Sequence, residues 1–447
     1  MSATLPGAVI DPETLARRRH RLMGALGDGL LLLPTAPHLV RNGDTHHEFR
    51  PSSDFEHLCG FPEPESTLVI AKRGKVERAI LFVPPRDKER EVWDGKRHGP
   101  EGARRRFGVD AAHPSSELWK MLPELLFGHA RVFTTLGKQR AFDEALFKAF
   151  ERVAAKQRRN NPPAHPQIVD PLPALAELRK VKDAREVELL TRAAEITATG
   201  HLAAMRCVRP GMREYEVQAE LERAFRMGGS RRNGYNSIVA GGKNACILHY
   251  VENDQKLRAG DLLLIDAGAE FAGYTADVTR TFPVTGKFTP AQREVYAIVL
   301  RAQLRAIAAV RPGAAWNAPH LAATKELTRG LVALGILKGR IDAVVKKSAY
   351  RPWYMHGTSH WLGRDVHDVG AYQDAAGKPV RLRPGNVLTI EPGLYLPADD
   401  ARVPKRYRGI GIRIEDDVLV TPSGHRVLTA AIAKRVADLE LAIGASH

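Results

Sequence analysis

Three histidines that could bind a metal ion or carry a proton lie in one short stretch. Residues 354–370 read YMHGTSHWLGRDVHDVG and contain His356, His360 and His367 among glycine, apolar and acidic neighbours. The imidazole group is the commonest metal ligand in proteins, and it changes charge near neutral pH. The stretch by itself does not assign these two roles, because the partners that decide between them lie elsewhere in the chain.

A predicted hairpin supplies the first two acidic partners. In residues 261–284, DLLLIDAGAEFAGYTADVTRTFPV, an apolar run ends in Asp266, glycines flank a turn, and Asp277 follows in the second strand. With the turn near Phe271 and Ala272, we expect the two aspartates to face each other across the ladder. Opposed like charges are destabilising unless a cation lies between them. The apolar run indicates burial, which raises that cost.

Two further predicted strands each carry a glutamate. In NVLTIEPGLYL, residues 386–396, Glu391 is the last strand residue before Pro-Gly, and a buried glutamate without a partner is rare. In GIGIRIEDDVLV, residues 409–420, alternation places Arg413 and Glu415 on the face opposite the isoleucines. Taken alone, the hairpin could instead carry two exposed strand ends. The last stretch could be a half-exposed edge strand with a salt bridge.

Four carboxylates with one imidazole predict a site for two metal ions. Oxygen-rich sites with one imidazole suit Mn²⁺, with Co²⁺ or Zn²⁺ possible. Four carboxylates are too many for one tetrahedral zinc ion, whereas two ions bridged by carboxylates balance the charge. A water between the ions would lose a proton near neutral pH and become a nucleophile. One histidine would then be a ligand, and the other two would handle protons or a developing oxyanion.

The elements that position these residues fall into two regions. A chain of 447 residues exceeds the usual size of one core, so two domains are expected. The first region has short buried strands and two helices, and the Pro- and Asn-rich segment 157–175 is the best linker candidate. We therefore predict an N-terminal mixed α/β domain over 1–172 and a catalytic domain over 173–447.

The second region is predicted to contain four long helices. Asp183 with Glu186, and Thr289 with Gln292, form capping patterns before apolar-periodic stretches. The sequence VRPG ends the first and the third of these helices, which indicates a duplicated helix–sheet unit. The predicted helices cover residues 182–208, 213–229, 289–310 and 317–335. The fold class is α/β (α+β) throughout.

The composition of the chain indicates its cellular compartment and limits the kinds of partner that it can have. The net charge is +16, but the basic runs are short and scattered, which favours a solvated surface over a nucleic-acid partner. The three cysteines form no C-x-x-C pair, which favours a reducing cytoplasm and argues against a thiolate zinc site. No apolar window is long enough to span a bilayer, and we expect neither a secretory signal nor a membrane partner.

Several of these stretches together resemble one family. DAG…Y…ADVTRTFPV, HGTSHWLGRDVHDVG, TIEPGLY and GIRIEDDVLV occur in the order and spacing of the aminopeptidase P and prolidase family, whose catalytic domain has the pita-bread metallopeptidase fold. The likeness covers most of residues 180–440, including NGYNSIVAGGKNACILHYVEND (233–254). Residues 49–70 resemble the companion N-terminal domain of the aminopeptidase P branch. The resemblance implies a pita-bread domain with pseudo-twofold duplicated helix–sheet units.

The resemblance also implies a ligand set. Two divalent ions, usually manganese, would be bound by Asp266, Asp277, His360, Glu391 and Glu415. In that set Asp277 and Glu415 bridge the ions, and Asp266 chelates one of them. His360 and Glu391 hold the other, so that His360 is the ligand among the three neighbouring histidines.

Further residues are implied around the metals. His249, in ILHY, matches a family histidine near the substrate. His356 and His367 match histidines that contact the substrate or stabilise the tetrahedral intermediate. Arg413 matches a supporting arginine, and Tyr395 is expected to be a further member of the site beside the substrate.

Trp93 adds an expectation about assembly. It resembles a family tryptophan that reaches a neighbouring subunit's site, which implies a homo-oligomer, dimer or tetramer, with Trp93 near the substrate. Ordinary domain packing is the competing interpretation for this residue.

The predicted function is removal of the N-terminal residue from peptides with proline second. A hydroxide bridging the two metals would attack the first carbonyl, and Glu391 would pass the proton to the proline nitrogen. An Xaa-Pro dipeptidase is the alternative, because Arg364 replaces a usually apolar residue and could recognise a carboxylate or point to solvent. A methionine aminopeptidase would lack the long N-terminal domain, and a non-catalytic pita-bread binding protein would not need all five ligands.

Overall fold

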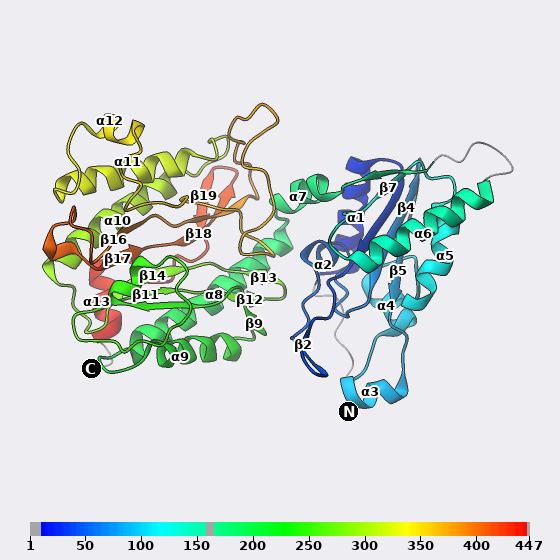
Figure 1. The fold of residues 1–447 in the computed structure, drawn as a ribbon, viewed down its shortest axis with the longest axis horizontal. Coiled ribbons are helices and arrows are strands. Elements are labelled where there is room, and N and C mark those ends of the chain that lie inside the picture. The colour runs from blue at the N-terminus through cyan, green and yellow to red at the C-terminus, as the bar shows by residue number, and fades with distance from the viewer. Residues whose placement is uncertain (1–9, 158–164, 445–447) are drawn as a thin grey trace. The chain divides into compact units, whose positions relative to one another are not determined.

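The computed structural model describes residues 10–157 and 165–444 (Figure 1). By their internal contacts the residues form two units, Met1–Arg179 and Lys180–His447. The boundary predicted after residue 172 differs from this division and cuts α7 (Leu172–Lys180) near its start. Residues 158–164 of the proposed linker lie outside the described residues, and its remainder forms β8 (Gln167–Val169) and the beginning of α7.

The N-terminal unit is built on a mixed six-stranded sheet with the order β6-β5-β4-β1-β7-β8. Pairs β1–β4 and β4–β5 are antiparallel, whereas β1–β7, β5–β6 and β7–β8 are parallel. The strands other than β8 are β1 (Gly29–Pro34), β4 (Thr67–Arg73), β5 (Val76–Val83), β6 (Ala111–Pro114) and β7 (Arg131–Phe133). A separate small hairpin pairs β2 (Val40–Asn42) with β3 (Thr45–His46).

The central strand of this sheet is buried on both faces. In β1, Leu31 packs into one hydrophobic cluster, while Leu30 and Leu32 pack into another on the opposite face. A continuous apolar run is what such a strand requires, because helices cover both faces. The helices are α1 (Pro12–Leu26), α2 (Ser53–Cys59), α3 (Lys88–Asp94), α4 (Gly99–Phe107), α5 (Leu118–Leu126) and α6 (Arg140–Gln157), in addition to α7.

The C-terminal unit contains the four predicted helices. They are α8 (Ala184–Cys207), α9 (Glu214–Met227), α10 (Pro290–Ala308) and α11 (Ala318–Ala333), followed by the shorter α12 (Ile341–Lys346) and α13 (Val436–Gly444). Both predicted capping boxes are confirmed: Asp183 exchanges hydrogen bonds with Glu186, and Thr289 does so with Gln292. Helix α8 packs on α9, and α10 packs on α11.

Antiparallel sheets accompany these helix pairs. One has the order β10-β11-β14 and another the order β15-β18-β19, and smaller sheets pair β13-β12-β9 and β16-β17. Each long helix pair therefore precedes a three-stranded sheet, which is the arrangement that the repeated VRPG indicates. The strands are β9 (Arg232–Asn233), β10 (Ile238–Gly241), β11 (Leu262–Asp266), β12 (Ala269–Phe271), β13 (Tyr274–Thr275), β14 (Thr279–Pro283), β15 (Val387–Ile390), β16 (Gly393–Leu396), β17 (Ile410–Arg413), β18 (Asp416–Thr421) and β19 (Gly424–Val427).

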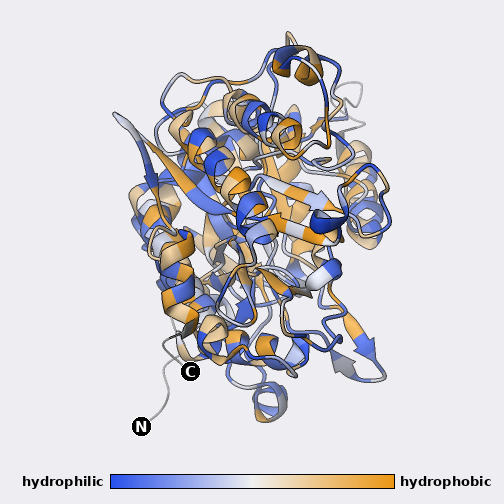
Figure 2. Cartoon of the chain, turned by 90° about the vertical axis from the view of Figure 1, so that its left-hand side faces the viewer, coloured by the Kyte–Doolittle hydropathy of each residue, from blue (hydrophilic) through white to orange (hydrophobic). Residues whose placement is uncertain are grey.

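One large hydrophobic core holds this unit together. Residues of all four long helices pack against β11, β14, β15 and β17 in a single cluster. Figure 2 shows hydrophobic and hydrophilic residues mixed along the helices, as expected of helices with one face on a core. Leu263 and Ile265 of β11 face this cluster and Leu264 faces a smaller one, so the strand that leads to Asp266 is buried as predicted.

The predicted hairpin register is wrong by two residues. The turn is formed by Ala272 and Gly273, both with positive φ, and Asp266 pairs with Thr279 rather than with Asp277. Positive φ at both central residues is the two-residue turn that matches the twist of a hairpin. The ladder is also interrupted at Gly268, where an added Cβ would lie 1.8 Å from the carbonyl oxygen of Ala276.

No helix within residues 10–157 or 165–444 combines the length and the apolar character that crossing a membrane requires.

A buried histidine of α8 gives a testable pH dependence of stability. The His201 side chain is 0% exposed, its Nε2 lies 3.1 Å from the Ala267 carbonyl oxygen, and burial lowers its pKa from 6.5 to about 4. Between these values only the unfolded chain takes up the proton, so stability falls as the pH falls. From pH 7 to pH 5 this group should remove about 2 kcal/mol of unfolding free energy.

The His201→Gln variant should lack this share of the acid sensitivity, because glutamine does not titrate. Urea unfolding of both proteins at pH 7 and pH 5, with chelator present throughout, measures the difference. Equal losses in the two proteins would contradict the assignment.

Candidate metal centre

The five residues predicted to be ligands all line one cavity of about 510 Å³ in the C-terminal unit. Asp266 is the last residue of β11, and Asp277 lies between β13 and β14. His360 belongs to the loop before β15, Glu391 follows the last residue of β15, and Glu415 lies between β17 and β18. Each therefore stands at the end of a strand or in a connection, where its side chain can leave the regular alternation of a sheet.

Hydrogen bonds outside the ladders fix the two glutamates. Strand β15 ends just before Glu391, close to the predicted end at Pro392-Gly393, whereas the predicted strand over 409–420 is broken at Glu415 into β17 and β18. At the breaks, the Glu391 amide donates to the Thr358 carbonyl at 2.9 Å and the Glu415 amide donates to the Thr279 carbonyl at 3.0 Å. These bonds satisfy backbone groups that the broken ladders would leave unpaired.

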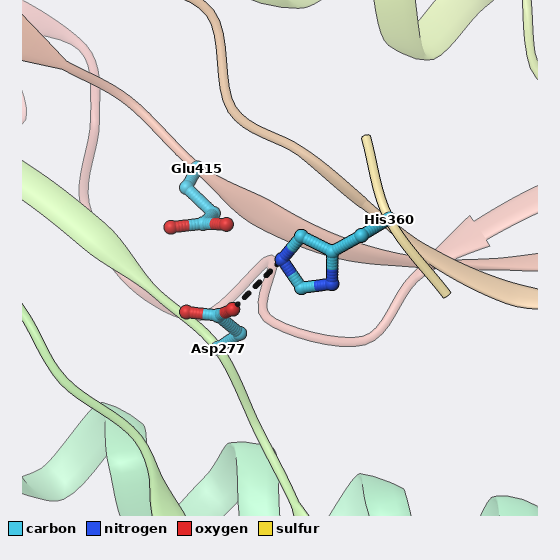
Figure 3. Close-up of side chains that lie close together, drawn as sticks. All are labelled: Asp277, His360 and Glu415. Carbon is cyan, nitrogen blue, oxygen red and sulfur yellow. Dashed lines mark ion pairs between the residues drawn. The ribbon is translucent and has the colours of Figure 1, made fainter. Parts of the chain in front are cut away.

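Three of the five form a compact cluster (Figure 3). Single ligand atoms of Asp277, His360 and Glu415 lie within 4.8 Å of one another. The His360 Nε2 is 3.2 Å from Asp277 Oδ2 and 3.6 Å from Glu391 Oε1. His360 Nδ1 lies 3.0 Å from the Trp361 carbonyl oxygen, so Nδ1 carries a proton and Nε2 faces the carboxylates.

The buried carboxylates of the cluster carry more negative charge than the neighbouring side chains balance. Burial, reinforced by neighbouring carboxylates, raises the pKa of Glu415 well above its usual value, and burial raises the pKa of Glu391 to about 7. Burial alone would lower the pKa of His360, but Asp277 and Glu391 outweigh it and raise that pKa to about 9. Protons or metal cations must balance these groups, and oxygen-rich donors with one imidazole are the set that hard divalent ions prefer.

Arg413 lines the cavity and brings a positive charge to the proposed ligands. Its guanidinium donates to Asp266 Oδ2 at 2.6 Å, to Thr279 Oγ1 at 3.1 Å and to Tyr395 Oη at 3.0 Å. The Thr279 hydroxyl in turn donates to Glu415 Oε2 at 2.7 Å. One arginine therefore holds two of the proposed ligands in place, one of them through a threonine.

The three predicted helper histidines also line the cavity. His356 Nδ1 is 2.7 Å from the Gly357 carbonyl oxygen and 3.5 Å from Glu391 Oε2. Burial and the charge of Arg413 lower the pKa of His356 to about 3, so its ring is neutral. The His367 ring meets the His360 ring edge-on at 4.4 Å between centres, and His249 is exposed and lines the cavity.

Two predicted substrate-binding residues, Tyr395 and Trp93, are not among the described residues that line this cavity. The Tyr395 side chain is 0% exposed and contacts Arg413 and His356 from behind the cavity wall. This position favours support of those two residues over contact with a substrate. Trp93, in α3 of the N-terminal unit, is 88% exposed and lines a different cavity, of about 1170 Å³, that includes none of the predicted ligands.

Tyr235 belongs to the site although no sequence pattern indicates it. Its hydroxyl lies 2.6 Å from Asp266 Oδ1 and 2.5 Å from Asp277 Oδ1, and it lines the cavity. One hydroxyl proton can be donated to only one of these oxygens, so the other contact needs a further proton or a cation. The residue lies in the stretch NGYNSIV, whose composition alone gives no sign of this role.

Arg364 does not point to solvent, which was one of its two predicted positions. Its side chain is 3% exposed, and the guanidinium carbon lies 4.4 Å from the centre of the Tyr274 ring. The Tyr274 hydroxyl is fixed by Glu186, to which it donates at 3.0 Å. Among the described residues that line the cavity Arg364 is absent, so its position does not favour recognition of a substrate carboxylate.

Comparison with known proteins bears on this geometry. The pattern of metallopeptidase family M24 matches residues 188–422, and that of the aminopeptidase P N-terminal domain matches residues 15–133. The chain is similar to the Xaa-Pro aminopeptidase of Escherichia coli, with 44% identity over 96% of this chain and 97% of that protein.

Solved structures of aminopeptidases have the same fold as this chain. The Pseudomonas aeruginosa aminopeptidase PepP superposes with a TM-score of 0.95 at 43% identity, covering 98% of this chain and 99% of that one. Escherichia coli aminopeptidase P, seen as a glutamate-to-alanine variant with substrate and as a zinc-substituted form with product, has a TM-score of 0.94 at 42% identity, again covering 98% and 99% of the two chains.

The fold and the clustered ligands define a metallopeptidase, with the pita-bread catalytic domain that the sequence resemblance implied. The chain belongs to metallopeptidase family M24 and, within it, to the Xaa-Pro aminopeptidases, also called aminopeptidase P. The site is accordingly one for divalent metal ions.

Divalent ions should stabilise the folded protein through these carboxylates. A ligand that binds only the folded state at about 100 times its Kd adds about 2.7 kcal/mol of stability. Asp277→Asn should lose most of this gain, because an amide removes one negative charge from the cluster, whereas Asp342→Asn, at an exposed acid on α12, should keep it. Thermal unfolding with and without Mn²⁺ tests this, and an equal gain in both variants would contradict the site.

Proposed function

We propose that this chain hydrolyses the bond between the first residue of a peptide and a proline in second position. The observation that carries the proposal is that one cavity gathers all five proposed ligands with His249, His356, His367 and Arg413. The near full-length likeness to Xaa-Pro aminopeptidases supports the same activity.

The proposed metal ligands are the five carboxylate and imidazole groups described above. We propose two divalent ions, with manganese preferred over cobalt or zinc because the donors are mostly oxygen. The zinc-substituted form of the Escherichia coli relative supports a site that also accepts other divalent ions. When bound, the ions would supply Lewis-acid activation of water and polarisation of the scissile carbonyl.

Glu391 is the proposed proton carrier. Glu391 lines the cavity with the other proposed ligands, where a carboxylate can act first as a general base and then as a general acid. Its carboxylate would take a proton from the attacking water and deliver it to the proline nitrogen as the bond breaks. The neutral His356 ring lies 3.5 Å from Glu391 Oε2 and lines the same cavity.

The remaining cavity groups are proposed to orient the peptide. His249 and His367 would contact the substrate or its tetrahedral intermediate through their ring nitrogens. Arg413 would keep Asp266 in place, and Tyr395 would fix Arg413 and His356 from behind. An Xaa-Pro dipeptidase would need a cation for the carboxylate of a dipeptide, and the stacking of Arg364 on Tyr274 gives that reading no support.

We further propose a cytoplasmic homo-oligomer, dimer or tetramer, that acts on proline-containing peptides and needs no nucleic-acid or membrane partner. An apolar side chain as exposed as Trp93 is costly in a monomer, and interfaces are enriched in tryptophan. The neighbouring Val92 is 81% exposed on the same helix, which extends the apolar surface.

Glu391→Ala tests the proton carrier. The variant should cleave an Xaa-Pro-Yaa peptide at least about 100-fold more slowly, because general acid–base catalysis contributes factors of that size. Wild type should cleave Xaa-Pro-Yaa better than the dipeptide Xaa-Pro, and its rate should depend on added Mn²⁺. Metal content is measured for each variant, and Glu188→Gln on the exposed face of α8 serves as the control. Full turnover by Glu391→Ala would contradict the role of Glu391 as the proton carrier.

Trp93→Ala tests the assembly. If Trp93 lies between subunits, the variant should shift the mass in light scattering toward the monomer and raise KM, while Trp119→Ala, at a partly buried site of the same unit, should leave the mass unchanged. An unchanged mass and KM for Trp93→Ala would show that this residue takes no part in assembly.

A further inference from the structure

We propose that Glu214 and Tyr250 act as a clamp that positions His249 for the reaction; this inference rests on the proposed function. Glu214 is the first residue of α9 and is 0% exposed, although it is neither a proposed ligand nor among the described residues that line the cavity. Acidic side chains are seldom fully buried unless they are paired or fully hydrogen-bonded.

Four donors satisfy this carboxylate. Glu214 Oε1 accepts from the Gly241 amide at 2.7 Å and from Asn244 Nδ2 at 3.1 Å. Glu214 Oε2 accepts from the Tyr250 hydroxyl at 2.7 Å and from the Gln255 amide at 2.9 Å. The first turn of a helix is also where the helix dipole favours a negative charge.

All four donors belong to one segment, residues 241–255. Gly241 is its first residue and Gln255 its last, and the single carboxylate therefore ties together both ends and the middle of the segment. Hydrogen bonds to a charged acceptor are stronger than those between neutral groups, so one residue determines the course of the whole segment.

The clamped segment carries one wall of the cavity. Leu248, His249 and Val251 line the cavity, and His249 itself is exposed. In the part of the chain that the structure describes, no hydrogen bond holds the His249 side chain. Its position therefore depends on the backbone, and the adjacent Tyr250 is buried with its hydroxyl on Glu214.

A second, independent anchor keeps the segment folded when the clamp is weakened. Asn253, at a φ of 50°, accepts from the Val239 amide at 2.9 Å and donates to the Ser237 carbonyl at 2.8 Å. The Tyr250 ring also packs in a small cluster with Ile238 and Leu264. Tyr250→Phe removes one hydroxyl and leaves both of these contacts, so the variant should fold.

A double-mutant cycle separates positioning from general stability. Four proteins are compared with Xaa-Pro-Yaa at saturating Mn²⁺: wild type, Tyr250→Phe, His249→Ala and the double variant. Small misplacements of a group that orients substrate can cost up to about 100-fold, so a loss of one hydrogen bond should lower kcat/KM about 10-fold. In the His249→Ala background the same change should cost less than about 2-fold, because the group being positioned is gone.

Two further variants sharpen the cycle. Tyr215→Phe, at a half-exposed tyrosine of α9, should leave kcat/KM unchanged. Glu214→Gln should act at least as strongly as Tyr250→Phe, because an amide offers one acceptor oxygen where the clamp needs two. An equal loss from Tyr250→Phe with and without His249 would overturn the positioning role.

Hydrogen exchange provides a readout that does not use activity. In metal-free protein, Tyr250→Phe should speed amide exchange in residues 244–252 while exchange in β11 stays as in wild type. Unchanged exchange in residues 244–252 would overturn the clamp. If wild type did not cleave Xaa-Pro-Yaa, the proposed function would fail, whereas the exchange result would still decide whether the clamp exists.

Discussion

The gathering of four carboxylates and one imidazole along one cavity is the constraint on which the rest of the C-terminal unit depends. Such a cluster repels itself, and the surrounding groups reduce that repulsion: Arg413 pairs with Asp266, and Tyr235 shares its hydroxyl between two aspartates. The raised pKa values of Glu391 and Glu415 show that these groups do not suffice alone. Protons or divalent cations must complete the charge balance, and the chain belongs to a family of metallopeptidases.

Much of this unit is predictable from local sequence. At the caps of Asp183 and Thr289 a side chain satisfies a backbone amide three residues away. Because this pattern is local, it can be predicted from the sequence. The carboxylates among the proposed ligands stand out for a similar reason, whereas the choice of His360 among three histidines comes from the family resemblance. An apolar run that ends in Asp266 is a strong indication of a buried carboxylate, and a buried carboxylate requires a partner.

What the sequence did not reveal depends on contacts between distant segments. The register of the hairpin is set by left-handed conformations at Ala272 and Gly273, and alanine gives little sign of one. Tyr235 becomes part of the site only because β9 and β10 carry it over the ends of other strands. The same holds for Arg364, whose place is determined by Tyr274 and not by its own neighbours in the sequence.

The close approach at Gly268 bears on how such a site tolerates change. Backbone touches backbone there, with no side chain between the segment after Asp266 and the segment before Asp277. The spacing of these two acids is therefore determined by a contact between peptide groups, which requires glycine at position 268 but no particular apolar side chain around it. The surrounding core can exchange one apolar residue for another over evolutionary time while the separation of the two acids stays constant.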